Sequence, residues 1–350
     1  MFNKIKIIDK VLFAKHLSLM LTSGVSLAQS IMELQEQSGS PAFKKILKEL
    51  SEEIKKGKTI AAALLKYEKL FGPLFINMIK VGEESGTLEE SLKHLASQLE
   101  SSYELKKKVK GAMMYPLLVL GATLSVGFGL AIFVLPKLLT FFKSLNVKLP
   151  ITTRILLATV GNLEKYGPYY ILGLIIFIVL FRLLLKTKKA KLIFHSLLIE
   201  MPIFGGLVKK LNLAYFTRTL ATLLKSGVTI VEALEISAAT LSNMAYRESF
   251  KEASERLRKG ESLSVFLESK PRLIPSFVAK MVEIGEKSGS LEETLFYVAD
   301  FYEKDVDSAT KNLANILEPI LLIGVGLVVG VVAISILMPI YQFTSSIQTR

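Results

Sequence analysis

The sequence predicts an all-α membrane protein with two tandem cytoplasmic helical-bundle repeats and three transmembrane helices. Of its 350 residues, 51% are hydrophobic, and the mean hydropathy of +0.44 is too high for an ordinary soluble globule. Residues 13–140 align without a gap onto 216–343, at a constant offset of 203, with 34 identities in 128 positions. Apolar residues recur at helical steps of three and four, and strand-like alternation is absent from the sequence.

The first helical bundle is predicted over residues 1–112, where Ile46, Leu47, Leu50 and Ile54 form one such helical stripe. Each copy should contain about five to six short helices, given the usual length of helices in globular proteins. Ser-Gly pairs should supply the tight turns, since glycine tolerates a positive φ. These pairs are Ser23-Gly24 and Ser85-Gly86 in copy one, and Ser226-Gly227 and Ser288-Gly289 in copy two.

Hydroxyl residues followed three positions later by Glu or Gln predict capping boxes at helix starts. The four pairs are Ser26 with Gln29, Thr87 with Glu90, Thr229 with Glu232, and Ser290 with Glu293.

Three uncharged stretches predict membrane spans. No residue from Gly111 to Pro136 is charged, and a helix of about 20 residues crosses the hydrocarbon core. The first span is therefore placed at 113–135. The second is placed at 166–185, where Arg182 can snorkel to the interface, and the third at 317–338.

Basic residues beside the spans predict the orientation, because Lys and Arg are retained on the cytoplasmic side. Twelve of them flank one side of the membrane and six the other. Residues 1–112 and 186–316 are then cytoplasmic bundles, 136–165 a short extracytoplasmic loop, and 339–350 an extracytoplasmic tail. The expected location is the cytoplasmic (inner) membrane, multi-pass, with the N-terminus in the cytoplasm.

The formal net charge of +13 does not indicate a nucleic-acid partner, because the two bundles carry only +5 and +3. The lysine clusters at 106–110 and 186–191 are instead expected to meet anionic lipid headgroups. The chain has no Cys and three His, and it lacks phosphate-loop, zinc-protease and serine-hydrolase motifs. We therefore expect no catalytic residue, no cofactor and no metal site.

The strongest match between the copies is the segment 81–90 against 284–293, which reads V-G-E-E-S-G-T-L-E-E and I-G-E-K-S-G-S-L-E-E. Its helix-turn residues are Gly82, Glu83, Ser85 and Gly86 in copy one, and Gly285, Glu286, Ser288 and Gly289 in copy two. A long helix and a membrane span beginning near Pro116 or Pro319 follow each motif. This combination resembles the type II secretion F / type IV pilus inner-membrane platform family, and the small size is similar to competence-type members.

The resemblance implies a non-enzymatic platform for assembly of a type IV pilus, a type II secretion pseudopilus or a competence pilus. It implies a cytoplasmic hexameric ATPase, a pilin or pseudopilin and other inner-membrane assembly proteins as partners, and a homo-oligomer. An oligomeric small-solute transporter is the alternative, although the spans lack the charged or broken segments that line a path. A membrane-bound enzyme fits least, because no acid/base or nucleophile constellation is evident.

Acidic residues beside the motif are candidate partner contacts: Glu89, Glu90, Glu292 and Glu293. Together with Glu83 and Glu286 they could meet the ATPase or hold a cation between lobes, while capping of helix N-termini is the structural alternative. Glu318 is a candidate partner for the N-terminus of an incoming pilin, or is solvated at the interface.

Small residues in the third span indicate close helix packing. Gly326 and Gly330 form a G-x-x-x-G pattern, which suits contact with a pilin, a second protomer or a neighbouring span of the same chain. Pro116 and Pro319 are assigned to the same packing role at the starts of their spans.

Overall fold

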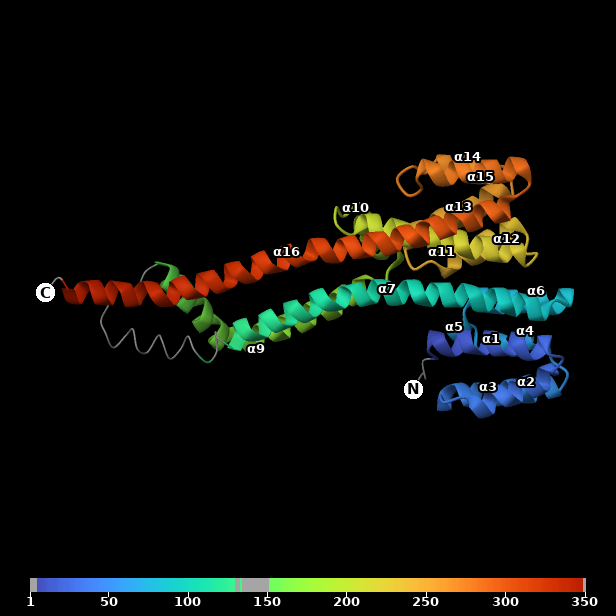
Figure 1. The fold of residues 1–350 in the computed structure, drawn as a ribbon, viewed down its shortest axis with the longest axis horizontal. Coiled ribbons are helices and arrows are strands. Elements are labelled where there is room, and N and C mark those ends of the chain that lie inside the picture. Colours follow the sequence, from blue (N-terminus) through green and yellow to red (C-terminus); the bar gives the residue numbers. More distant parts are fainter. Residues whose placement is uncertain (1–4, 130–132, 134–150, 349–350) are drawn as a thin grey trace. The chain divides into compact units, whose positions relative to one another are not determined.

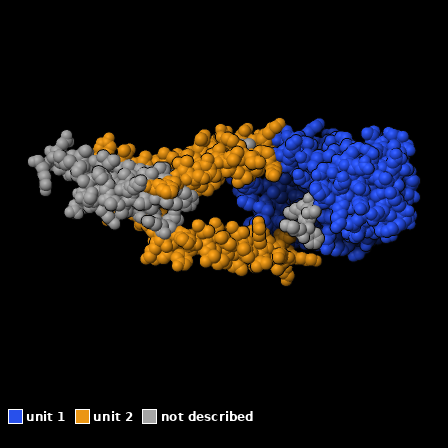
Figure 2. Space-filling model, turned by 90° about the horizontal axis from the view of Figure 1, so that it is seen from below, with its two compact units in different colours: residues 1–108, 192–309 blue, residues 109–191, 310–350 orange. Residues whose placement is uncertain are grey.

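A computed structural model of the chain describes residues 5–129, 133 and 151–348, and every regular element in this part is a helix (Figure 1). The all-α prediction is confirmed. The chain divides into two compact units, which Figure 2 colours separately. The first unit contains residues 1–108 and 192–309, and the second contains 109–191 and 310–350.

The first repeat forms a bundle of short helices that ends in the start of a long one. Its helices are α1 (Ile7–Thr22), α2 (Leu27–Gln37), α3 (Pro41–Lys55), α4 (Ile60–Leu65), α5 (Glu68–Phe71), α6 (Pro73–Ser85) and α7 (Leu88–Gly129). Hydroxyls at three N-caps explain where helices begin, because each accepts a bond from a backbone N–H of the first turn. These are Ser26, Ser40 and Thr59.

The second repeat has the same order of helices, except that α5 has no helical counterpart. They are α11 (Gly205–Lys225), α12 (Ile230–Thr240), α13 (Met244–Leu257), α14 (Leu263–Glu268), α15 (Ser276–Ser288) and α16 (Leu291–Gln348). The bounds of α12, α14 and α15 lie 203 residues after those of α2, α4 and α6. Corresponding helix pairs also pack together, since α1–α2, α2–α3 and α4–α6 have the counterparts α11–α12, α12–α13 and α14–α15. The repeat seen in the sequence is therefore a repeat of structure.

Aromatic side chains fill the centre of each bundle. In copy one, Phe13 contacts Phe43, Phe71 and Phe75, with ring centroids 5.9 to 6.2 Å apart. In copy two, the equivalent Phe216 stacks on Phe250 and is 1% exposed. Removing these rings from water drives the folding of each bundle, because a buried aromatic ring contributes a large apolar area.

The helices that contain the predicted first and third spans begin well before those spans. Helix α7 passes through the predicted boundary at 112 and α16 through that at 316, so Pro116 and Pro319 lie inside helices rather than at their starts. Helix α9 (Ile151–Leu184) begins within the predicted extracytoplasmic segment 136–165, so residues 151–165 of that segment are helical. The hydropathy pattern missed this segment because charged residues such as Arg154 and Lys165 interrupt its apolar run without interrupting the helix.

Two described helices are long and apolar enough to cross a membrane, within Leu88–Gly127 and Lys165–Leu184. They overlap the first two predicted spans. Helix α10 (Lys188–Glu200) and α11, bent by 111°, would also pass as one broken span, but α11 supplies core residues such as Leu213 and Phe216 to the second bundle. The first and third predicted spans are described only in part, because residues 130–132, 134–135 and several side chains of 317–338 lie outside the described residues. Residues 136–150 and 349–350, which belong to the predicted loop and tail, also lie outside them.

The Ser-Gly turns have the predicted backbone. Gly24, Gly86, Gly227 and Gly289 have φ values between +71° and +83°. A side chain is strained in this left-handed region, so these positions favour glycine.

Replacing Gly86 or Gly289 with Val should lower the free energy of unfolding by about 1–2 kcal/mol each, the usual cost of the left-handed conformation for a residue with a Cβ. Thermal melting of the purified full-length chain, followed by circular dichroism, measures the effect. Gly39→Val is the control, because Gly39 has no positive φ and open space around a Cβ. Equal melting temperatures for G86V, G289V and G39V would contradict the prediction.

Candidate functional site

The repeated motif forms the turn between α6 and α7, and again between α15 and α16. The N–H of Thr87 donates to the carbonyl of Gly82 at 2.8 Å, and that of Ser290 donates to Gly285 at 3.0 Å. These bonds close both helix ends in a Schellman-type arrangement. The hydroxyls of Ser85 and Thr87 lie 2.7 Å apart, and those of Ser288 and Ser290 lie 2.6 Å apart. The two turns are therefore built alike down to their side-chain contacts.

The first glycine of each motif allows the two helices to approach closely. A Cβ placed on Gly82 would lie 2.7 Å from the Ser91 side chain, and one placed on Gly285 would lie 2.9 Å from the Cα of Leu291. Both distances are shorter than a van der Waals contact. Glycine is therefore required for packing at this position, whereas the glycine at the end of the motif is required for its φ.

The motif glutamate holds the start of a different helix. Glu83 accepts bonds from the N–H groups of Ile60 and Ala61, at 2.6 and 2.9 Å, at the N-terminus of α4. Glu286 does the same for Leu263 and Ser264 at the start of α14, at 2.7 and 3.2 Å. We call each of these arrangements a glutamate clasp. A carboxylate here satisfies N–H groups that have no partner within the helix and complements the helix dipole.

The capping alternative therefore describes Glu83 and Glu286, although they cap a neighbouring helix rather than their own. Glu89 and Glu90, and Glu292 and Glu293, lie in the first turns of α7 and α16, with only Glu292 half-buried. Oε1 of Glu90 lies 3.4 Å from Nε2 of His94.

Three of the four predicted capping boxes have a different geometry. Ser26 accepts a hydrogen bond from the N–H of Gln29, but Thr229 makes no side-chain cap bond. Thr87 and Ser290 use their hydroxyls to contact Ser85 and Ser288 instead. At Thr87 and Ser290, a nearby hydroxyl engages the side chain that was expected to cap the helix, and the spacing rule does not take this into account.

The candidate residues of the membrane segments lie apart from this turn along the chain. Glu318 and Pro319 are exposed in α16, whereas Pro116 is buried in α7. No described atom lies within 4 Å of a Cβ placed on Gly326 or Gly330. Their role in packing remains a prediction.

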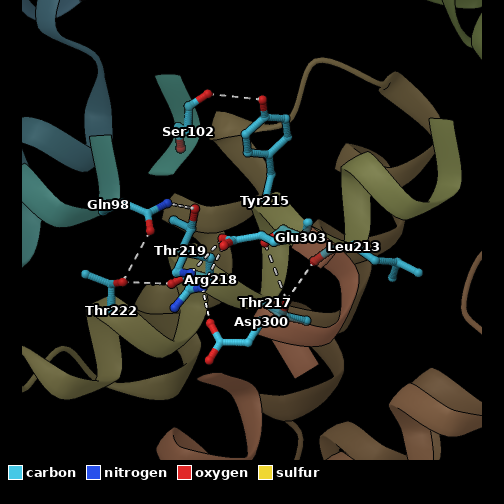
Figure 3. Close-up of polar contacts among 11 residues, drawn as sticks. Gln98, Ser102, Leu213, Tyr215, Thr217, Arg218, Thr219, Thr222, Asp300 and Glu303 are labelled. Atoms are coloured by element: carbon cyan, nitrogen blue, oxygen red, sulfur yellow. Dashed lines mark hydrogen bonds and ion pairs between the residues drawn. The ribbon is translucent and has the colours of Figure 1, made fainter. Parts of the chain in front are cut away.

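A polar junction between the two repeats was not predicted (Figure 3). Gln98 of α7 is 2% exposed and donates to the Thr219 hydroxyl of α11 at 2.8 Å. Its carbonyl accepts from the Thr222 hydroxyl at 3.4 Å, and the Tyr215 hydroxyl donates to the carbonyl of Ser102 at 3.4 Å. Burial, followed by the negative charge of Glu303, raises the pKa of Tyr215. The phenol therefore stays neutral and can donate.

An ion pair beside the junction recurs in both copies. Arg218 donates to Glu303 through Nε and Nη2 at 2.8 and 2.9 Å, and it also contacts Asp300 (Figure 3). Burial alone would lower the pKa of Arg218, but bonds to Glu303 and Asp300 raise it. The equivalent pair in copy one is Lys15 with Glu100, 3.3 Å apart and exposed. The sequence held a signal for this pair, because a basic residue (Lys15, Arg218) and an acidic residue (Glu100, Glu303) recur at the repeat offset of 203.

Two further polar features lie in the first unit. Nδ1 of His195 accepts from the N–H of Met244 at 2.8 Å, so a histidine without a predicted role caps α13. An open cleft of about 620 Å³ lies between α7 and α16, lined by Glu100, Glu104, Leu105, Asp300, Glu303, Asp307 and other residues. Among the described residues, no group of three or more His, Asp or Glu is arranged to hold a metal ion.

Two clasped bundles, each continuous with a helix directed to the membrane, define a tandem-repeat helical membrane protein. The chain matches the family described as Type II secretion system (T2SS), protein F, twice, over residues 13–136 and 216–339. It belongs to this family.

Several curated relatives resemble nearly the whole chain. The type IV pilus assembly protein PilC of Thermus thermophilus is 34% identical over 98% of this chain and 84% of its own length. PilC of Pseudomonas aeruginosa is 31% identical over 97% of this chain and 91% of its own length. The type II secretion system protein F of Vibrio cholerae is 30% identical over 96% of this chain and 83% of its own length. The resemblance noted in the sequence is thus confirmed.

Replacing Glu83 or Glu286 with Ala should lower the free energy of unfolding by about 1–2 kcal/mol, as for the loss of other N-caps. Chemical or thermal unfolding of the full-length chain measures the difference. Glu84→Ala is the control, since Glu84 is exposed and lies 3.9 Å from Lys80 in a surface pair worth little. If E83A lowers the free energy of unfolding no more than E84A does, the clasp does not stabilise the bundle.

Proposed function

We propose that this chain is a non-enzymatic inner-membrane platform for assembly of a type IV pilus, a secretion pseudopilus or a competence pilus. The observation that carries the proposal is the duplicated family domain, with a clasped bundle and a membrane-directed helix in each copy. Relatives that match almost the whole chain are named for pilus assembly and for type II secretion. A platform of this kind couples a cytoplasmic hexameric ATPase to the extraction of pilin from the membrane.

The acidic first turns of α7 and α16 support an ATPase contact. Glu89, Glu90 and Glu293 are exposed, so they are available to a basic partner surface. They occur at equivalent places in both copies, which gives the chain two similar docking points. Charged rims of this kind govern association rate and specificity more than affinity.

The membrane-directed helices support contacts with pilin and lipid. Glu318 is an exposed acid at the predicted start of the third span, where it can pair with the charged N-terminus of a pilin. The lysines at 106–110 and 186–191 flank the predicted spans and complement anionic headgroups. Other inner-membrane assembly proteins complete the machine.

The transporter alternative has less support. A solute path needs charged or broken helices near the middle of the membrane. Helix α9 is unbroken, and its segment from Tyr166 to Phe181 carries no charge.

Deleting the chromosomal gene tests the proposal. Surface filaments, counted by electron microscopy, should disappear while immunoblots show normal ATPase and pilin levels. A plasmid copy should restore the filaments. Intact filaments in the deletion strain, with no second family member encoded, would refute the assembly role.

Charge reversal should locate the ATPase contact. Changing Glu89 and Glu90, or Glu292 and Glu293, to Lys should reduce co-purification of the ATPase while membrane insertion stays normal. The matched control is Glu52→Lys with Glu255→Lys, because these residues are also exposed, occupy equivalent positions in α3 and α13, and change the charge equally. Undiminished co-purification with both pairs would remove these residues from the interface.

A further inference from the structure

The two repeats contact each other through different faces. Copy one uses α6 and α7, and copy two uses α11 and α12. The side chains that meet are Gln98 and Ser102 on α7, and Tyr215, Thr219 and Thr222 on α11 (Figure 3). Since α6 and α7 correspond to α15 and α16, and α11 and α12 to α1 and α2, this interface is heterologous.

Among the described residues, a heterologous contact between two copies leaves one matching face uncovered on each. In copy one this is the face of α1 and α2, and in copy two it is the face of α15 and α16. The offset of 203 pairs the residues: Leu12, His16 and Leu19 on α1 correspond to Tyr215, Thr219 and Thr222, while Phe301 and Asp305 on α16 correspond to Gln98 and Ser102. We call these two surfaces the open α1–α2 face and the open α15–α16 face.

Large apolar side chains lie on both open faces. Leu12, Leu19 and Met32 lie on α1 and α2, and Ile284, Tyr297 and Phe301 on α15 and α16, each between 41% and 66% exposed. At the interface in use, Gln98, Thr219 and Thr222 are at most 4% exposed. Exposed apolar groups gathered on one face indicate a docking surface.

The side chains on both open faces differ in polarity from those at the interface within the chain. Within the chain, the Gln98 amide meets the hydroxyls of Thr219 and Thr222. The corresponding residues on the open faces are Phe301 for the amide, and His16 and Leu19 for the hydroxyls. Tyr215 and Thr222 have the apolar counterparts Leu12 and Leu19, and Gln98 has the apolar counterpart Phe301, so these positions of the two open faces remain complementary to each other. A hollow of about 130 Å³ beside α1, lined in part by Leu12, Phe13 and His16, offers space for an incoming side chain.

We propose that a second copy of this chain covers these faces, so that the open α1–α2 face of one chain packs on the open α15–α16 face of the next. The contact repeats between chains the one that joins the two repeats within each chain. Because it is heterologous, it builds a ring or a row of chains rather than a two-fold dimer. The proposal holds whether or not the chain assembles filaments.

The intrachain junction predicts which residues meet. Gln98 lies within hydrogen-bond distance of Thr219 and Thr222, so Phe301 should lie against His16 and Leu19 of the neighbouring chain. Tyr215 contacts the carbonyl of Ser102, so Leu12 should lie near Asp305.

Cysteine cross-linking in membranes tests this arrangement, and the chain has no cysteine of its own to interfere. Two differently tagged chains are co-expressed, one carrying Leu19→Cys and the other Phe301→Cys, and mild oxidant is added. The expected product is a disulfide between the two tags. Gln98→Cys with Thr222→Cys in one chain is the intrachain reference, because these two side chains lie 3.4 Å apart across the corresponding junction.

Two results would overturn the proposal. One is the absence of the mixed product when the intrachain reference forms. The other is efficient linking of L19C chains to each other with no mixed product, which would indicate a two-fold interface.

The mass of the full-length chain in nanodiscs gives a second readout. Wild-type chains should exceed the single-chain mass, and Leu19→Lys or Phe301→Lys should reduce the assembly to single chains. Val265→Lys is the matched control, because Val265 is an exposed apolar residue of α14 outside both open faces. Single wild-type chains, or unchanged assembly of both variants, would refute the proposal.

Discussion

The bundles depend on the need to satisfy the N–H groups at the start of a short helix. Helices α4 and α14 each have only six residues, too few to be stable alone. A glutamate from a later helix, α6 in copy one and α15 in copy two, supplies the missing acceptors. This contact fixes α4 against α6 and α14 against α15, and it places the glycine-lined crossing with the long helix immediately beside it. The family motif is therefore first a folding device, and its exposed acids are carried on the rigid turn that results.

Much of this arrangement could be predicted because its signals are local and occur twice. The Ser-Gly turns and the motif could be recognised from their glycines and from their recurrence in both copies. The positive φ angles of Gly86 and Gly289 agree with that reasoning. The partner of Glu83 could not be predicted, because α4 lies 23 residues earlier in the chain and carries no matching charge. Spacing rules identify a capping carboxylate but not the helix that receives it.

The junction between the repeats was missed for the opposite reason. Gln98 and Thr219 differ from their counterparts Phe301 and His16, so an alignment of the two copies showed nothing in common at these positions. The informative signal was the difference between the two copies at these positions, because each kind of face is covered within the chain in one copy only. The first part of α9, residues 151–165, was missed because hydropathy locates apolar segments, whereas helix ends are decided by backbone hydrogen bonding.

The continuity of α7 and α16 has a mechanical consequence. Each runs without a break from the clasped turn into the predicted membrane segment, with no flexible linker to absorb a twist applied to the bundle. A force applied to either bundle is therefore transmitted along a continuous hydrogen-bonded helix. Pro116 and Pro319 each remove one backbone hydrogen bond from these helices, at equivalent positions, and bending is easiest there. The two long helices therefore share one stiffness profile, in which the most easily bent point falls at the same position of each repeat.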